Sequence, residues 1–209
     1  MLALDGVTVS VPSGTVCALV GRNGSGKSTL LRVLATLVLP DGGSALVEGH
    51  DVVDDDVAVR RCVALVTADD RSFSLRLTGR ENLELFAGLH GVPGDAVGEV
   101  LARVDLAGAA GDVYATYSSG MRQRLALARA LLTQPSVLLL DEPFRALDEV
   151  SADTLRSVIA AAAEGGATVL VATHHLEELG GRCDRAVRLE AGRVVADDDL
   201  AGWCAEVAP

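Results

Sequence analysis

The sequence predicts an α/β fold: a parallel sheet covered by helices, with a helical segment inserted into the middle of the chain. The first observation behind this prediction is a set of short, continuous apolar runs, such as Val137–Leu140, which are typical of strands buried on both faces. The second is that segments of helical period separate these runs. The third is a glycine-rich loop, Gly21–Thr29, that follows an apolar run and precedes a helical pattern. Strands and helices in this order indicate parallel pairing.

The first third of the chain is expected to contain two strands and one helix. Val7–Val11 alternates apolar and polar residues, which predicts a half-buried strand that ends at the turn Pro12–Gly14. Val16–Val20 is continuously apolar and predicts a buried strand. A helix is expected from about Ser28 to the turn at Pro40–Gly43. Its apolar positions recur at helical spacing: Leu30, Leu31, Val33, Leu34, Leu37 and Val38.

The rest of the chain continues the alternation after a helical interruption. Asp54–Asp56 is expected to be a solvated turn or a helix start, and residues 68–134 carry helix and loop patterns with no strong strand signal. The other predicted elements are a strand at Cys62–Thr67, a strand at Val137–Leu140, a helix at Ser151–Ala163 ended by Gly165-Gly166, a strand at Thr168–Ala172, and a hairpin at Arg185–Ala196 that turns at Ala191-Gly192.

The 209 residues are enough for one domain with a substantial core. Hydrophobic residues make up 49% of the chain and aromatic residues 3%, so aliphatic side chains must build that core. We expect a single domain over 1–209, with a core lobe at about 1–67 and 136–209 and a helical lobe at about 68–135.

Charge and hydropathy exclude several classes of protein. A net charge of −11 argues against a nucleic-acid partner, because phosphate backbones are bound by basic surfaces. No apolar run approaches the roughly 18–20 residues of a membrane span, and the start lacks a secretory pattern. We therefore expect a cytosolic chain. The cysteines are widely spaced and are expected to be reduced, mostly buried residues rather than a zinc site or a disulfide framework: Cys17, Cys62, Cys183 and Cys204.

The loop Gly21–Thr29 matches G-x-x-x-x-G-K-[ST], a pattern whose backbone N–H groups surround nucleotide phosphates. Lys27 is the only lysine among the 18 lysine and arginine residues. A compact ammonium on a flexible stem reaches outer phosphates in a way that a planar guanidinium does not. The residues expected to bind the nucleotide here are Gly21, Arg22, Asn23, Gly24, Ser25, Gly26, Lys27, Ser28 and Thr29.

Further polar groups follow in a fixed order. Asp141 ends an apolar strand and is expected to hold Mg²⁺ together with the Ser28 hydroxyl, and the adjacent Glu142 can orient or deprotonate an attacking water. Upstream, Tyr117–Arg124 opens a helix with a Ser-x-Gly turn, where backbone N–H groups form an anion site. Downstream lie Ala146-Leu147-Asp148 and then Thr173-His174-His175 after a strand.

This constellation resembles the ATP-binding subunits of ABC transporters, and the resemblance covers essentially the whole chain. It implies a RecA-like P-loop NTPase core with an inserted helical subdomain, of the ABC ATPase type. It also implies Walker A at Gly21–Thr29, the signature at Ser118–Met121 and Walker B at Val137–Glu142. The signature tail and the segment Arg76–Leu83 are most similar to bacterial exporters.

The resemblance implies roles for particular residues. The implied catalytic residues are Lys27, Glu142 and His174, and the nucleotide contacts outside Walker A are Ser118, Gly120 and Asp148, the last as the D-loop aspartate. The implied activity is ATP hydrolysis with Mg²⁺, with each ATP held between two ATP-binding subunits, in a homodimer or a heterodimer. The implied partner is a separate membrane-spanning subunit, and the implied location is the cytoplasm, peripheral to the inner face of the cell membrane.

Two departures from the family pattern bear on coupling and on base recognition. The family has a glutamine where Ala68 stands, and the chain's glutamines are Gln123 and Gln134. The family's adenine-stacking aromatic near the start has no counterpart, since the first aromatic residue is Phe73. Either the chain starts later than the full protein does, or this subunit binds ATP without that stack. For the 209 residues as they stand, we expect weak discrimination between ATP and GTP. The surface around Arg71–Leu77 is expected to dock the membrane subunit, with an ordinary packed loop as the alternative.

Other functions were weighed against ATP-driven transport. A P-loop GTPase needs an Asn-Lys-x-Asp motif, which is impossible when Lys27 is the only lysine. Soluble ABC ATPases of DNA repair or translation carry coiled-coil insertions or a second cassette, and the sequence has neither. A degenerate cassette that binds ATP as a regulatory switch with little turnover remains the alternative.

Overall fold

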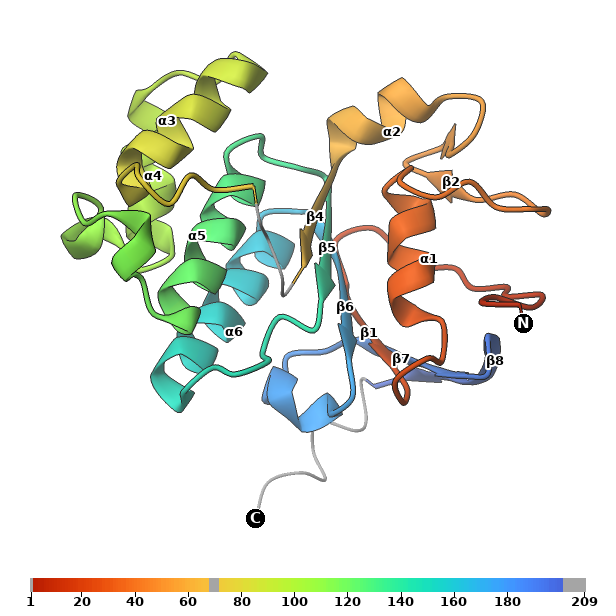
Figure 1. Ribbon diagram of the computed structural model, residues 1–209. Helices are drawn as coiled ribbons and strands as arrows, with labels where there is room; N and C mark the ends of the chain where they lie inside the picture. The colour runs from red at the N-terminus through yellow and green to blue at the C-terminus, as the bar shows by residue number, and fades with distance from the viewer. Residues whose placement is uncertain (1, 68–71, 201–209) are drawn as a thin grey trace.

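A six-stranded sheet runs through the centre of the computed structural model, which describes residues 2–67 and 72–200 (Figure 1). The strand order is β4-β5-β6-β1-β7-β8. The first five strands in this order pair in parallel, and β8 pairs antiparallel with β7. The strands are β1 (Val16–Val20), β4 (Val63–Thr67), β5 (Val137–Asp141), β6 (Thr168–Thr173), β7 (Arg185–Glu190) and β8 (Arg193–Asp199), with a small separate hairpin of β2 (Leu46–Val47) and β3 (His50–Asp51). The predicted mostly parallel α/β fold is confirmed.

Helices cover both faces of this sheet. Figure 1 shows α1 and α2 on one side and α5 and α6 on the other, with α3 and α4 packed outside α5. The α-helices are α1 (Lys27–Leu34), α2 (Asp56–Cys62), α3 (Gly79–His90), α4 (Asp95–Arg103), α5 (Ser119–Leu131) and α6 (Glu149–Glu164). Short 3₁₀ turns lie at Ala107–Ala109, Tyr114–Thr116 and Leu176–Leu179.

The apolar side chains form two clusters, one on each face of the sheet. Leu31 of α1 and Val59 of α2 pack with Leu139 and Leu170 on one face. On the other face, Leu125 of α5 belongs to a larger cluster that extends outward to α3 and α4. Strands β1, β5 and β6 are therefore buried on both sides, which explains their continuous apolar runs.

The predicted strand at Val7–Val11 is wrong: the segment carries no strand assignment. The alternation still decides which side chains are buried. Val7, Val9 and Val11 pack against the apolar cluster that contains Leu31 of α1, whereas Thr8 is exposed. A strand also requires a neighbouring backbone to receive its hydrogen bonds, and side-chain alternation carries no information about that neighbour.

The predicted helix from about Ser28 to Pro40 is too long, because α1 ends at Leu34. Thr36 has a φ of 58°, and the Leu37 N–H donates to the Arg32 carbonyl at 2.8 Å. This is the Schellman arrangement that closes a helix. Leu37 and Val38, which continue the helical spacing in the sequence, lie beyond the helix and are exposed.

Other predicted boundaries shift by a few residues. Cys62 ends α2, so the strand begins at Val63, and α2 itself begins at Asp56 within the acidic run. Four further elements extend beyond their predicted bounds: β5 includes Asp141, α6 begins at Glu149, β6 includes Thr173 and β8 reaches Asp199. The hairpin turns at Ala191-Gly192 as predicted.

Within the described part of the middle segment, the ordered elements are helices and 3₁₀ turns, plus one isolated bridge between Thr78 and Val113. None of the described helices is long and apolar enough to cross a membrane. Cys17 and Cys183 are buried and Cys62 is half-buried, whereas Cys204 lies outside the described residues.

Candidate functional site

The predicted site residues of the loop Gly21–Thr29, of Asp141-Glu142 and of His174 converge where three neighbouring parallel strands end. Val20 of β1 lies opposite Thr173 of β6, and Asp141 of β5 lies opposite Ala172 of β6. The segments that follow these positions, the loop Gly21–Thr29 among them, therefore leave the sheet along one edge. The carboxyl edge of a parallel sheet is the usual place for a ligand in open α/β folds.

The loop Gly21–Thr29 depends on glycine at two close approaches. A Cβ on Gly21 would lie 2.3 Å from the Leu189 carbonyl oxygen, and one on Gly26, whose φ is 109°, would lie 2.7 Å from the Ala3 carbonyl oxygen. Gly26 is also the N-cap of α1. The first N–H groups of that helix have no partner within the helix, so they are available to an anion at the loop.

The residues of the loop divide into buried and exposed positions. Ser25 and Lys27 are buried, whereas Arg22, Asn23 and Gly24 are exposed at the surface of the loop. The backbone N–H of Ser25 donates to the Arg22 carbonyl at 3.1 Å and closes the turn. The exposed positions are therefore free to face a ligand from outside.

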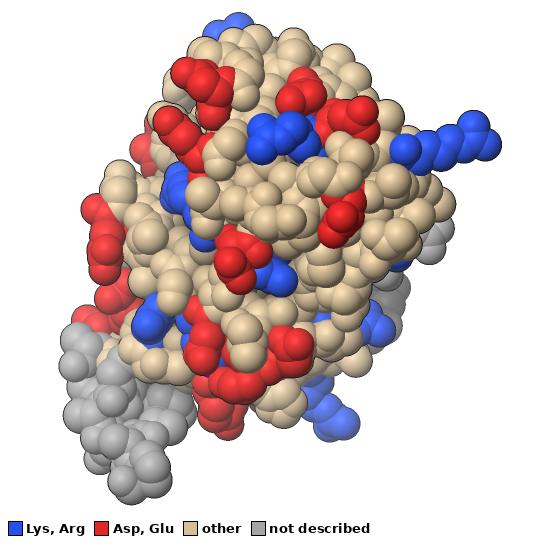
Figure 2. All heavy atoms as spheres, turned by 90° about the vertical axis from the view of Figure 1, so that its left-hand side faces the viewer, with Lys and Arg blue, Asp and Glu red and all other residues tan. Residues whose placement is uncertain are grey.

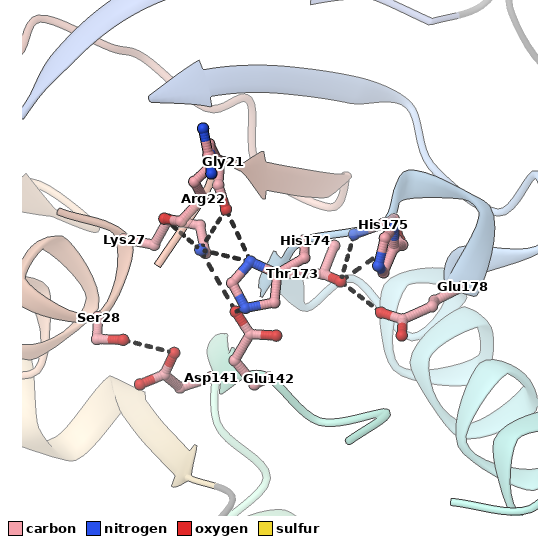
Figure 3. A network of polar contacts seen from close by, with 10 residues as sticks. All are labelled: Gly21, Arg22, Lys27, Ser28, Asp141, Glu142, Thr173, His174, His175 and Glu178. Atoms are coloured by element: carbon pink, nitrogen blue, oxygen red, sulfur yellow. Dashed lines mark hydrogen bonds and ion pairs between the residues drawn. The ribbon is translucent and has the colours of Figure 1, made fainter. Parts of the chain in front are cut away.

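The Lys27 ammonium lies at the centre of a polar network (Figure 3). Its Nζ donates to the Gly21 carbonyl at 2.6 Å and lies 3.4 Å from Glu142 Oε1. It also lies 3.4 Å from His174 Nδ1. The side chain is 5% exposed, and a buried ammonium is unfavourable unless polar groups surround it. These contacts bring the three predicted catalytic residues together.

The His174 ring bridges the two sides of this network. Its Nδ1 lies 2.9 Å from the Gly21 carbonyl oxygen, and its Nε2 lies 3.1 Å from Glu142 Oε1. The ring therefore links the loop Gly21–Thr29, the proposed phosphate loop, to the residue that follows β5. The neighbouring His175 is exposed and lies on the Glu178 side of Thr173 in Figure 3, apart from Lys27 and Glu142.

Glu142 occupies a strained position directly after β5. Its φ is 51°, an uncommon conformation for a residue with a side chain. Its backbone N–H donates to the Ala172 carbonyl at 2.9 Å, which fixes the peptide against β6. Strain of this kind persists where the surrounding structure enforces it, and it clusters at functional sites.

Ser28 and Asp141 lie together, as the prediction of a Mg²⁺ site requires. The Ser28 hydroxyl donates to Asp141 Oδ1 at 2.9 Å, and Asp141 is buried. A hydroxyl and a carboxylate are the hard oxygen ligands that Mg²⁺ prefers. Their chemistry and their proximity fit the ion.

The predicted signature and D-loop residues form a second group, whose described hydrogen bonds do not involve Lys27. Ser118 caps α5 by accepting from Met121 N at 3.2 Å, and Asp148 caps α6 by accepting from Ser151 N at 2.8 Å. The hydrogen bonds from Ser151 hold the pKa of the Asp148 carboxyl below its usual value. A Cβ on Gly120 would lie 2.7 Å from Ser151 Oγ, so the two helix starts are in direct contact.

Sequence reasoning missed two polar residues behind His174. Thr173 is fully buried and its hydroxyl donates to the Glu178 carboxylate; it also accepts from His175 N at 3.1 Å. The signal available in the sequence was a threonine at the last position of an apolar strand. Position 68, where the family glutamine is absent, lies outside the described residues, as do Asp69, Asp70 and Arg71.

The expected docking segment divides between core and surface. Phe73 is buried, with its ring centre 5.6 Å from that of Phe86 and 5.0 Å from that of Tyr114. Leu75 is 58% exposed. The alternative of an ordinary packed loop therefore holds for Phe73 and does not hold for Leu75.

Comparisons with known proteins agree with this geometry. The family model described as ABC transporter matches residues 4–145. The daunorubicin resistance ATP-binding protein DrrA3 of Streptomyces coeruleorubidus is 43% identical, over 93% of this chain and 63% of that protein. The daunorubicin/doxorubicin resistance ATP-binding protein DrrA of Streptomyces peucetius is 39% identical, over 93% of this chain and 60% of that protein.

A solved structure supports the same relationship. It is a dimeric post-hydrolysis state of an ATP-binding cassette bound to ADP and Pi, 28% identical, with a TM-score of 0.83 over 96% of this chain and 91% of that one. The chain spans about three fifths of the length of the curated relatives it matches.

Proposed function

Because this chain belongs to the ABC transporter family as an ATP-binding domain, we propose that it binds and hydrolyses ATP to drive a separate membrane-spanning subunit, as part of an exporter. The observation that carries the proposal is the meeting of Lys27, Glu142 and His174 at the carboxyl edge of the sheet, beside the pair Ser28 and Asp141. Each has a distinct task in hydrolysis.

ATP binding would begin at the phosphate loop. Phosphate oxygens would compete with the Gly21 carbonyl for the Lys27 ammonium, and the first N–H groups of α1 would face them. Ser28 and Asp141 would hold Mg²⁺, which neutralises charge on the phosphates when bound. The loop would thereby fix the outer phosphate near Glu142.

Glu142 would orient and deprotonate the attacking water. A carboxylate held in one orientation by Lys27 and His174 is prepared for this role, since a general base must lie within hydrogen-bonding reach of its water. His174 would act beside it, because its ring already spans the loop and the carboxylate.

A second ATP-binding subunit would complete each site. Ser118, Gly120 and Asp148 lie at helix starts whose backbone N–H groups suit an anion, yet their polar partners belong to α5 and α6 rather than to the Lys27 network. A neighbour's ATP would be their ligand. The dimeric state of the related cassette bound to ADP and Pi supports this arrangement.

The membrane subunit would dock on exposed leucines at the start of the helical lobe, which we place at about 68–135. Leu75, Leu85 and Leu89 are 58%, 51% and 71% exposed, and the last two are one turn apart on α3. Contiguous exposed apolar side chains mark binding surfaces. Docking there would hold the chain at the inner face of the cell membrane, on the cytoplasmic side. The names of the Streptomyces relatives support export of a small molecule.

The comparisons give no support to the alternative of a cassette that senses ATP with little turnover. ATP hydrolysis by the purified chain with Mg²⁺ separates the two functions. The Glu142→Gln variant should keep ATP affinity and lose turnover by about 100-fold or more, as removal of a general base does. Glu164→Gln, an exposed glutamate at the end of α6, is the matched control and should retain the parent rate. A parent chain that binds ATP and releases no phosphate would overturn the proposal.

A further inference from the structure

Arg156 of α6 makes an unusual set of contacts for a residue remote from the phosphate loop. Its Nε donates to the Glu178 carbonyl at 2.7 Å, and its Nη1 donates to Glu149 Oε1 at 2.8 Å and to Asp153 Oδ1 at 2.7 Å. The side chain is 15% exposed. The hydrogen bond from Arg156 to Glu149 raises the pKa of the guanidinium above its usual value.

One of these hydrogen bonds and a further ring contact of Arg156 reach segments that carry proposed site residues. Glu149 directly follows Asp148 at the start of α6. The guanidinium carbon also lies 5.9 Å from the ring centre of Phe144, which follows Glu142 by two residues and is buried. A cation over an aromatic face is attracted to it. One side chain thus contacts both the segment after β5 and the start of α6.

The third contact leads to His174. Glu178, whose carbonyl accepts from Arg156, uses its carboxylate to accept from the Thr173 hydroxyl (Figure 3). Thr173 is fully buried and immediately precedes His174 at the end of β6. These two hydrogen bonds connect Arg156, through the 3₁₀ turn that contains Glu178, to the residue that precedes His174.

We infer that Arg156 is a positioning residue that holds the segments of Glu142, Asp148 and His174 in one arrangement. The inference rests on the proposed function, because it takes from there the roles of those three residues. Arginine suits the task because its planar fork donates in fixed directions from several nitrogens, whereas lysine offers a single one. Gly180 leaves room for it, since a Cβ there would lie 3.1 Å from Arg156 Cδ.

The first experiment compares Arg156→Met and Arg156→Lys with Arg185→Met. Arg185 makes two hydrogen bonds to Asp197 and starts β7, at the end of the sheet opposite the phosphate loop. Both Arg156 variants should lower kcat by about tenfold or more, because a slightly misplaced catalytic group costs that much. The KM for ATP and the ATP affinity should stay within about twofold. Arg185→Met should leave kcat, the KM for ATP and the ATP affinity unchanged.

Normal kcat in the two folded Arg156 variants would overturn the inference, and so would a loss of ATP affinity equal to the loss of kcat. Thermal unfolding of each variant shows whether the protein remains folded. Arg156→Lys keeps the positive charge, so it provides a folded test if the methionine variant is unstable.

The second experiment tests the link through Thr173. Thr173→Val removes the hydroxyl that binds Glu178 and nearly keeps its shape. If both residues act through Glu178, the double variant with Arg156→Met should be no slower than the slower single variant. If the two losses of kcat multiply in the double variant, Arg156 and Thr173 do not act through the same contact with Glu178.

Glu142→Gln, measured in parallel, distinguishes failure of the proposed function from failure of this inference. An active Glu142→Gln variant overturns the proposed function, whereas an inactive one beside a normal Arg156→Met variant overturns this inference alone.

Discussion

At the scale of single residues, the site is defined by how its charges are satisfied. Lys27 is 5% exposed, and its ammonium is surrounded by the Gly21 carbonyl, Glu142 and His174. A buried charge is unfavourable unless polar or oppositely charged groups surround it, and these three groups do so here. Under the proposed function, the phosphates of ATP would take over part of this pairing with Lys27.

Lys27→Ala should weaken ATP binding by about 10- to 100-fold, because charge-assisted hydrogen bonds are worth about 1.5–3 kcal/mol each. The dissociation constant of ATP for the purified variant is the measurement. Arg32→Ala, which removes an exposed positive charge from the last turn of the same helix, should leave it unchanged. An unaltered affinity in Lys27→Ala would show that the loop does not bind phosphate.

The site residues differ in how far the sequence could predict them. Asp141 and His174 follow apolar runs that could only be parallel strands, so their convergence at one edge follows from topology. Arg156 and Glu178 could not be predicted in the same way. An arginine on a helix has many possible partners, and its contact with a carbonyl 22 positions away depends on the packing of α6 against the turn after β6.

At the scale of elements, α3 shows how a single buried polar side chain can order a loop. Asn82 is fully buried; its Oδ1 accepts from Ser74 N at 2.8 Å, and its Nδ2 donates to the Ser74 carbonyl at 3.1 Å and to the Thr78 carbonyl at 2.9 Å. Thr78 and Glu81 add a capping box at the start of the helix. Together they hold Leu75 in its exposed position.

Asn82→Ala should reduce the free energy of unfolding by about 1–3 kcal/mol, because buried backbone groups of the loop would lose their partner. Urea denaturation gives this value. Glu84→Ala on the exposed side of α3 serves as the control, with an expected change within about 0.5 kcal/mol. Equal stability of the two variants would mean that solvent satisfies the loop as well as Asn82 does.

The sequence pattern predicts some elements of this fold better than others. Strands β1, β5 and β6 are recognisable because burial on both faces leaves a continuous apolar run. Val7–Val11 has the alternating pattern of a strand and forms none. The prediction failed because alternation indicates burial on one side and gives no information about backbone pairing. The end of α1 fails for a different reason, since Thr36 adopts a left-handed conformation that apolar spacing does not reveal.

At the scale of the whole molecule, charges of both signs are spread over the face that the middle helices form. Figure 2 faces the side formed by the middle helices, and on the described atoms of that face acidic and basic side chains are interspersed, without one continuous basic area. Exposed leucines lie among them on α3 and in the loop before it. We therefore keep the exposed leucines, rather than the charges around them, as the proposed contact with the membrane subunit.

Leu85→Glu combined with Leu89→Glu should abolish co-purification with the membrane subunit, because two charges would be buried in an apolar contact. ATP binding by the purified chain should be unchanged. Leu46→Glu is the matched control: Leu46 is 66% exposed, and it lies in β2 on the opposite side of the molecule from α3 (Figure 1). Co-purification that survives the double substitution would place the membrane contact elsewhere.

Two inactive variants should restore each other if each ATP is shared between subunits. Ser118→Arg disables the signature and leaves Lys27 intact, so the isolated chain should still bind ATP, whereas Lys27→Ala disables the phosphate loop and leaves Ser118 intact. In a symmetric head-to-tail dimer, a mixed pair contains one site with both substitutions and one site with neither. Mixing the two purified variants should therefore recover part of the ATPase activity that each lacks alone. If Ser118 instead acts within its own chain, every site in the mixture carries a defect, and no activity returns at any ratio of the two proteins.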